Sequence, residues 1–120
     1  NVDCDFFMSG DEVDYFYRLR KAGKVISVLD AIHYHPDVSQ RPYTTAKVYY
    51  YVKNTLVLNK RYFNAVWLRH ALTVATVIVR TVSRNDIGTA LSLVLGANAP
   101  MFYSAITRGL QGKLGKDFND

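Results

Sequence analysis

The chain has 120 residues, about the length of one domain, and its 49% hydrophobic and 21% charged content is ordinary for a globular protein. Its single cysteine, Cys4, excludes an internal disulfide framework and is typical of a reducing compartment. The net charge of +5 is unevenly distributed: residues 1–40 contain seven acidic and four basic residues, whereas residues 41–116 contain eleven Lys or Arg and one acidic residue, Asp86. This polarity predicts a metal or acceptor site in the acidic part, followed either by a surface for phosphates, nucleic acid or an anionic membrane, or by ordinary solvated helix faces.

The first predicted helix begins after Ser9 and ends at Gly23. Ser9-Gly10-Asp11-Glu12 fits a capping box, in which the Glu12 side chain bonds back to the Ser9 backbone. At about 100° per residue, Glu12 projects into the apolar side of this helix, between Phe16 and Leu19. That apolar side also includes Tyr15 and Ala22, and the solvated polar face comprises Asp11, Asp14, Arg18 and Lys21. Glu12 is therefore either a capping residue or a partly desolvated general base.

A short β element is predicted at about 24–35, where two apolar runs are stopped by Pro36. His33 and His35 are two residues apart, so on a strand they point to the same face. Such a pair can hold a metal, although two ligands rarely complete a site, and a histidine at a strand end is otherwise only hydrogen-bonded. The polar segment 36–42 is predicted to be a loop.

Four further helices are predicted, at 43–59, 63–83, 86–95 and 100–109. Tyr50 is expected in the core. The third of the five helices is strongly amphipathic, with Trp67, Ala71, Val74, Ala75, Ile78 and Val82 on one face. The uncharged stretch 87–107 is long enough to span a bilayer, but its breaks favour two short helices, which either touch a membrane interface or pack as ordinary helices. Residues 109–116 are predicted to be a flexible basic tail.

Two stretches resemble one known family. F-F-M-S-G-D-E-V-D-Y-x-x-R-L-R-K-A-G-K-x-I-x-V-L-D-A-I-H-Y-H, at 6–35, resembles the second half of the catalytic domain of family 2 glycosyltransferases, in particular bacterial rhamnosyl-, galactosyl- and galactofuranosyltransferases with the GT-A fold. Tyr-Tyr-Tyr-Val-Lys-Asn, at 49–54, is similar to the family's "yy-x-x-RN" segment, with Lys53 in place of the usual arginine. The resemblance covers residues 1–60 well and the remainder loosely.

The resemblance implies a role for five residues. Asp11 and Glu12 match the acidic pair that opens a helix at the acceptor site, with Glu12 as the catalytic base, although the usual order in the family is Glu then Asp. Asp11 and Asp14 would shape the acceptor pocket. His35 would help to hold Mn²⁺ or Mg²⁺, and Lys53 would attract a phosphate.

The expected fold is α-rich α+β, with residues 1–60 as part of a GT-A catalytic domain on its acceptor and metal side, and residues 61–120 as a C-terminal helical region. Nothing in the sequence resembles the donor-binding strands and D-x-D motif of the family. We therefore expect the chain to be the C-terminal part of a larger enzyme, catalytically inactive by itself. Apolar surface around Phe6, Phe7 and Phe16 would then be left exposed.

The expected reaction is transfer of a sugar, with inversion, from a nucleotide-sugar to a hydroxyl of a glycan or lipid-linked acceptor. The expected location is the cytoplasm, with peripheral contact to the inner face of the membrane and homo-oligomerisation left open, and with no nucleic acid partner. The alternative is a small basic helical module without enzymatic activity, which binds nucleic acid or an anionic membrane surface.

Overall fold

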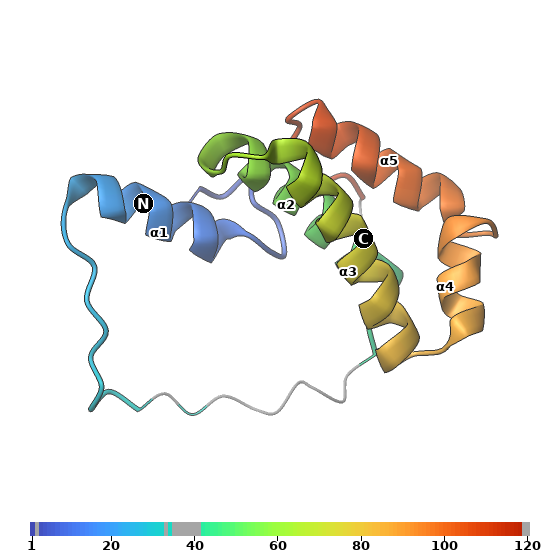
Figure 1. The fold of residues 1–120 in the computed structure, drawn as a ribbon, viewed down its shortest axis with the longest axis horizontal. Helices are drawn as coiled ribbons and strands as arrows, with labels where there is room; N and C mark the ends of the chain where they lie inside the picture. Colours follow the sequence, from blue (N-terminus) through green and yellow to red (C-terminus); the bar gives the residue numbers. More distant parts are fainter. Residues whose placement is uncertain (2, 33, 35–41, 119–120) are drawn as a thin grey trace.

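The computed structural model describes residues 1, 3–32, 34 and 42–118, and in these residues it contains helices and no strand (Figure 1). The helices are α1 (Asp11–Ala22), α2 (Thr45–Tyr62), α3 (Val66–Arg84), α4 (Ile87–Val94) and α5 (Ala99–Leu110). All five helices predicted from the sequence are present, with ends within a few residues of the expected positions. The helical part of the predicted fold class is therefore confirmed.

Local capping explains several of the helix boundaries. The Thr44 side chain accepts a hydrogen bond from the backbone of Lys47 at 3.4 Å and starts α2, and the Asp86 side chain accepts one from the backbone of Thr89 at 2.7 Å and starts α4. Pro100 lies in the first turn of α5, where its missing N–H costs nothing. Gly23 ends α1, with its N–H bonded to the carbonyl of Leu19.

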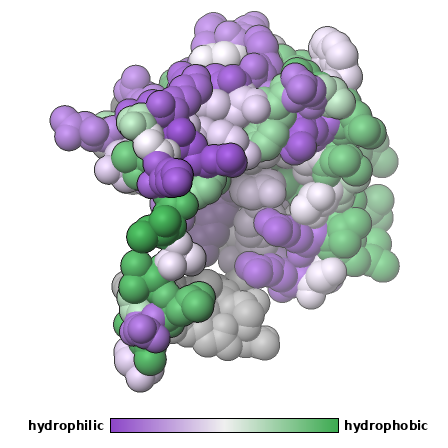
Figure 2. All heavy atoms as spheres, turned by 60° about the vertical axis from the view of Figure 1, so that its left-hand side comes forward, coloured by the Kyte–Doolittle hydropathy of each residue, from purple (hydrophilic) through white to green (hydrophobic). Residues whose placement is uncertain are grey.

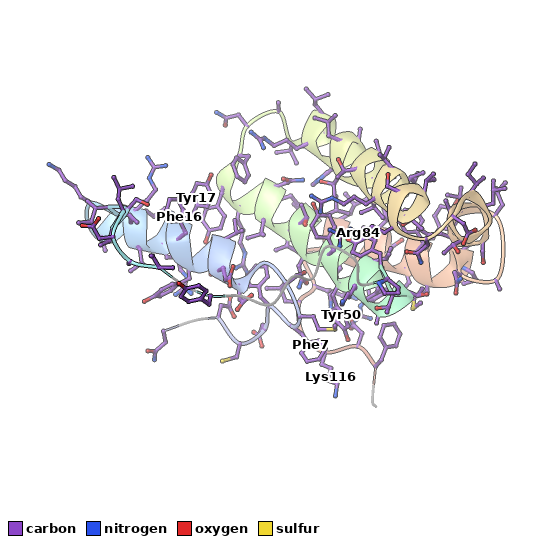
Figure 3. The ribbon with its side chains drawn as sticks, turned by 90° about the horizontal axis from the view of Figure 1, so that it is seen from below. Phe7, Phe16, Tyr17, Tyr50, Arg84 and Lys116 are labelled. Atoms are coloured by element: carbon purple, nitrogen blue, oxygen red, sulfur yellow. The ribbon has the colours of Figure 1, made fainter. Side chains whose placement is uncertain are left out.

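Helix α2 is the centre of the molecule, and it contacts α1, α3 and α5 (Figure 1). Its buried side chains surround most of its circumference, which is the pattern of a central core helix. Tyr50 is among them, as predicted, and Phe7 meets its ring edge-on at 4.8 Å (Figure 3). The remainder of this core is formed by Tyr43, Val48, Tyr49, Val52, Leu56, Val77, Leu93, Phe102 and Ala105.

The short β element predicted at about 24–35 is not formed in residues 24–32 and 34. Residues 24–28 have no strand partner, and a turn follows in which the Ala31 N–H bonds to the Val28 carbonyl at 3.3 Å. Ile26 and Leu29 are exposed by 78% and 91%. In Figure 2 the segment belongs to the largely green arm beside the grey atoms. A strand requires a neighbour that satisfies its backbone N–H and C=O groups, and the described residues contain no other strand. His33, His35 and residues 36–41 of the loop predicted at 36–42 lie outside the described residues.

Both ends of the described chain pack onto α2, which corrects two predictions. Phe6, expected to be exposed, is buried against Val57 and Leu58, and Phe7 is half-buried. The tail after α5, expected to be flexible, returns to the N-terminal segment, where the Gly115 backbone donates a hydrogen bond to the Asp5 carbonyl at 2.8 Å. Only Phe16 of the three named phenylalanines is exposed, because Phe6 and Phe7 find apolar partners within the chain itself.

Candidate acceptor site at the start of α1

The loop that precedes α1 is fixed by Asn54 of α2. The side-chain amide of Asn54 donates hydrogen bonds to the carbonyl oxygens of Phe7 and Ser9, at 3.0 and 2.7 Å. Gly10 follows with a φ of 93°, and a Cβ placed there would lie only 3.2 Å from side-chain atoms of Phe6 and Leu58. Glycine is therefore required at this turn for both conformational and steric reasons. The first turn of α1 is consequently held in one position against α2.

Asp14 attaches α1 to the end of α2. Its carboxylate is fully buried, and it accepts hydrogen bonds from Arg18 at 2.7 Å, Arg61 at 3.0 Å and the Tyr62 hydroxyl at 2.6 Å. Burial alone would raise the pKa of Asp14, but the hydrogen bonds from Tyr62, Arg18 and Arg61 outweigh it and hold the pKa below its ordinary value. Asp14 and Arg18 lie on the same face of α1, as predicted, and form an i,i+4 ion pair, whereas the expected solvation of Asp14 is wrong.

The side of α1 that faces α2 is therefore polar. Tyr17 stacks on Tyr62, with ring centroids 4.9 Å apart, and Lys21 lies over the same ring. Phe16 and Leu19, expected on the inner side, are exposed, and Glu12 is exposed with them (Figure 3 shows Phe16 and Tyr17 on α1). The charge and hydroxyl partners offered to Asp14 by the end of α2 decide this orientation, because an unpaired buried carboxylate is costly.

The predicted capping box is also wrong. Gly10, not Ser9, is the N-cap of α1, and no side-chain bond caps the helix start. The hydroxyl of Ser9 is buried without a hydrogen-bond partner. Glu12 therefore has no capping role, and its carboxylate is free to face solvent or a bound molecule. Asp11 lies half-buried beside it at the positive end of the helix.

A cleft of about 320 Å³ opens next to the start of α1. The loop before α1, α2 and the beginning of α3 supply its walls. The lining combines apolar side chains with Thr55, Asn59 and the cationic Arg69, which suits a molecule with both ring faces and hydroxyls. The complete set is Ser9, Gly10, Val13, Tyr51, Thr55, Leu58, Asn59, Phe63 and Arg69.

Lys53, predicted to attract a phosphate, lies fully buried beneath the tail. Its ammonium group donates to the Gly115 carbonyl at 2.6 Å and pairs with the carboxylate of Asp117, and it sits 4.8 Å from the centroid of the Tyr50 ring. Asp117 also pairs with Arg108 and accepts a hydrogen bond from the Tyr49 hydroxyl at 2.9 Å. As a phosphate ligand, Lys53 would first have to release the tail.

Burial raises the pKa of a carboxyl such as that of Asp117, but Lys53, Tyr49 and Arg108 more than compensate and hold the pKa below its ordinary value. Burial together with the Asp117 carboxylate raises the pKa of the Tyr49 phenol to about 12. The cluster is thus a closed anion site with an aspartate of the same chain as its occupant. Lys53 and the acidic pair of α1 therefore belong to two separate places in the fold.

The metal prediction rests on His35, which lies outside the described residues. Within residues 1, 3–32, 34 and 42–118, no three His, Cys, Asp or Glu side chains gather as metal ligands would. Of the predicted site residues within the described part of the chain, Asp11 and Glu12 lie together at an accessible place, whereas Asp14 and Lys53 are buried.

Asn54, Arg61 and Asp117 are structurally important residues to which the sequence analysis assigned no role. Asn54 belongs to the segment at 49–54 that resembles the family, and this resemblance could have indicated that Asn54 has a structural role. Asp117 lies 64 residues from its partner Lys53, and at this separation the charge pattern of the sequence does not predict which residues pair.

Comparison of the chain with known protein families, with curated proteins and with solved structures finds no match. Function is accordingly inferred from the quoted resemblance and from local geometry.

Proposed function

We propose that this chain is the acceptor-side and C-terminal helical part of an inverting, GT-A family 2 glycosyltransferase. The observation that carries the proposal is the exposure of Glu12 on a fixed turn of α1. Its carboxylate is exposed, makes no cap, and stands on a helix turn that Asn54 and Asp14 fix against α2. A general base must be reachable by its substrate and held in position, and Glu12 meets both requirements.

In the proposed reaction, the Glu12 carboxylate accepts the proton of an acceptor hydroxyl. The acceptor oxygen attacks the anomeric carbon of the donor sugar from the side opposite the nucleotide. The new C–O bond forms as the bond between the anomeric carbon and the diphosphate oxygen breaks, and the nucleoside diphosphate leaves with that electron pair. The configuration of the sugar is thereby inverted. His35 would be one ligand of Mn²⁺ or Mg²⁺, which, when bound, would supply neutralisation of the negative charge on the diphosphate.

The cleft beside α1 is the proposed acceptor pocket. Thr55 offers a hydrogen bond to an acceptor hydroxyl, and Arg69, whose guanidinium lies 4.0 Å from the centroid of the Phe63 ring, suits an acceptor that carries a phosphate or other anion. Asp11, half-buried at the helix start, would contribute to acceptor binding. Asp14 is enclosed by Arg18, Arg61 and Tyr62, so within this proposal it acts as a positioning residue for Glu12 rather than as an acceptor ligand.

The test is an assay of the protein in which donor-binding strands and a D-x-D motif precede these residues. A panel of nucleotide-sugars, screened for hydrolysis and for thermal stabilisation, should identify one donor that the protein uses. Substitution Glu12→Gln should then abolish most transfer while leaving donor-induced stabilisation intact. If no nucleotide-sugar stabilises the protein or is hydrolysed by it, the proposal is wrong.

A further inference from the structure

Three of the four buried residues of α3 are polar, the fourth being Val77, and several of its large apolar residues are exposed. The polar residues of α3 that face the core are His70, Thr73 and Thr81. The side-chain amide of Asn59, on α2, lies 3.4 Å from Nδ1 of His70 and donates a hydrogen bond to the Thr73 hydroxyl at 3.2 Å. A helix that faces only water normally has the opposite arrangement, with its apolar side packed inward. The outward side of α3 therefore requires an apolar environment.

The exposed apolar residues of α3 form one continuous arc. Trp67 is 77% exposed, and Leu68, Leu72 and Val79 are also exposed. At about 100° per residue, these four side chains fall within an arc of about 140°. The neighbouring helix α4 adds a second apolar stripe at every fourth residue, formed by Ile87, Leu91 and Leu95, which are all exposed. Isolated surface leucines are normal, but seven large apolar residues on two adjoining helices are not.

A groove continues this apolar surface between α3 and α5. It has a volume of about 500 Å³, and its walls are apolar except for His70. Burial and the charge of Lys60 lower the pKa of His70, so its ring adds no charge to the groove at neutral pH. Trp67, Val74, Ile78 and Ile106 supply much of the lining. A slot of this kind is suited to a hydrocarbon chain.

The charges around the apolar arc are positive. Arg69 and Arg80 lie on α3 beyond one edge of the arc, and both are exposed, with their guanidinium groups over the rings of Phe63 and Tyr51. Arg84 is exposed on the side of α3 opposite the arc. The acidic residue of this region, Asp86, is occupied in capping α4 through Thr89. An amphipathic helix with Trp and Leu on one face and arginines beside it is the form that lies in the interface of an anionic bilayer.

We propose that the apolar arc of α3, together with the stripe of α4, docks onto the surface of a membrane that contains anionic lipids, with the groove admitting an acyl chain. The arc enters the headgroup region, and Arg69 and Arg80 contact lipid phosphates. Among the described residues, no single helix is long and apolar enough to cross a membrane, while α4 and α5, bent by 62° at their break, would satisfy length and composition only as a pair. Arg69 is shared by the docking surface and the proposed acceptor cleft, and the remaining residues of the docking surface are separate from that cleft.

Trp67 allows a direct test, because it is the only tryptophan in the 120-residue chain. The chain is titrated with vesicles of phosphatidylcholine alone and with vesicles that also contain phosphatidylglycerol. The Trp67 emission should shift to the blue, and lipids with brominated acyl chains should quench it, only when the anionic lipid is present. High salt should weaken the binding because it screens the arginines.

The double variant Leu68→Ser with Leu72→Ser should lower the vesicle partition coefficient by about tenfold or more, because two buried apolar side chains are lost. Substitution Arg80→Gln should lower it by about fivefold on anionic vesicles only, whereas Arg84→Gln, on the side of α3 opposite the arc, should leave it nearly unchanged. The matched control is Ile26→Ser with Leu29→Ser, which removes two equally exposed apolar residues from the segment after α1. Circular dichroism confirms that each variant folds.

Three results would overturn the proposal. The first is an unchanged Trp67 emission on both kinds of vesicle. The second is vesicle binding without an emission shift, which would mean that basic residues alone make the contact. The third is a blue shift that follows protein concentration in the absence of lipid, which would mean that a second copy of the chain covers α3.

Discussion

At the scale of single residues, substitution of Glu12 should change catalysis without changing stability. Because its side chain is exposed and makes no cap, Glu12→Gln should leave the melting temperature nearly unchanged. An amide does not take up a proton near neutral pH, so transfer by the protein that includes the donor-binding part should fall by ~10²–10⁴-fold. The matched control is Asp11→Asn, expected to alter acceptor affinity more than turnover. Near-normal turnover of Glu12→Gln would remove the catalytic assignment.

Asp14 is expected to show the reverse behaviour. Asp14→Asn leaves Arg18, Arg61 and Tyr62 without the anion that they surround, and the free energy of unfolding should fall by ~1–3 kcal/mol. Urea unfolding at neutral pH measures this change. Arg18→Gln is the comparison, because Arg18 is 41% exposed and pairs in partial contact with water, so its loss should cost less than about 1 kcal/mol. Equal costs for the two variants would contradict the buried role of Asp14.

The sequence predicted the positions of Ser9 and Asp14 relative to α1 better than it predicted their burial and hydrogen-bond partners. The i,i+4 pair of Asp14 with Arg18 was predictable from spacing alone. The burial of Asp14 was not, because it depends on Arg61 and Tyr62, which are more than forty residues away in the chain. Ser9 matched a capping motif, but Asn54 holds the Ser9 carbonyl and Gly10 takes the N-cap position instead. Long-range hydrogen bonds thus overrode the local signal.

At the scale of elements, the tail after α5 is attached to α2 through a buried ion pair. Lys53→Met would leave the Asp117 carboxylate, which is only 7% exposed, without its main partner, and should cost ~3–5 kcal/mol of stability. Adding Asp117→Asn should restore part of that loss, because the uncompensated charge is gone. A double-mutant cycle by urea unfolding measures the coupling. Strictly additive effects would show that Lys53 and Asp117 do not hold the tail together.

The helices were predictable because their caps and periodicity are local. Thr44, Asp86 and Gly23 mark boundaries within a few residues of themselves. The segment at 24–32 was mispredicted for the opposite reason: its composition favours a strand, but a strand forms only where another one pairs with it. The amphipathic character of α3 was predictable from spacing, but most of the predicted apolar face lines the groove beside α5, and of the exposed arc only Trp67 was predicted to lie on that face. The orientation of α3 depends on Asn59 of α2.

At the scale of the whole molecule, uncovered apolar surface predicts self-association. Val13, Phe16 and Leu19 of α1 are exposed, and so are Ile26 and Leu29 of the segment that follows it. These residues would contact the donor-binding part in the proposed enzyme. Without that part they form an exposed apolar surface that favours association between copies of the chain. Sedimentation velocity should show association that rises with concentration and weakens in Phe16→Ser with Leu19→Ser. A strictly monomeric chain at high concentration would contradict this expectation.

The pH dependence of the whole fold follows from how its parts are attached to α2. The attachments of α1, α3 and the tail each contain a buried titratable group, namely Asp14, His70 and Asp117. Burial, assisted by the charge of Lys60, lowers the pKa of His70 in the folded state. The unfolded chain therefore takes up a proton first, and stability should decline as the pH falls below about 6.5 toward the lower folded pKa.

The two aspartates act in a separate and more acidic range. The folded pKa of each is lowered, because the hydrogen bonds and charges around it outweigh the effect of burial. Their contribution to stability is present above the unfolded pKa of about 3.9 and is lost as the pH falls through the folded pKa. Thermal unfolding between pH 7 and pH 3 should therefore show two stages of loss. His70→Gln, which keeps a hydrogen-bond acceptor for Asn59, should remove the first stage and leave the second. A wild-type melting temperature that stays constant down to about pH 4.5 would show that His70 does not couple α3 to α2 through its protonation state.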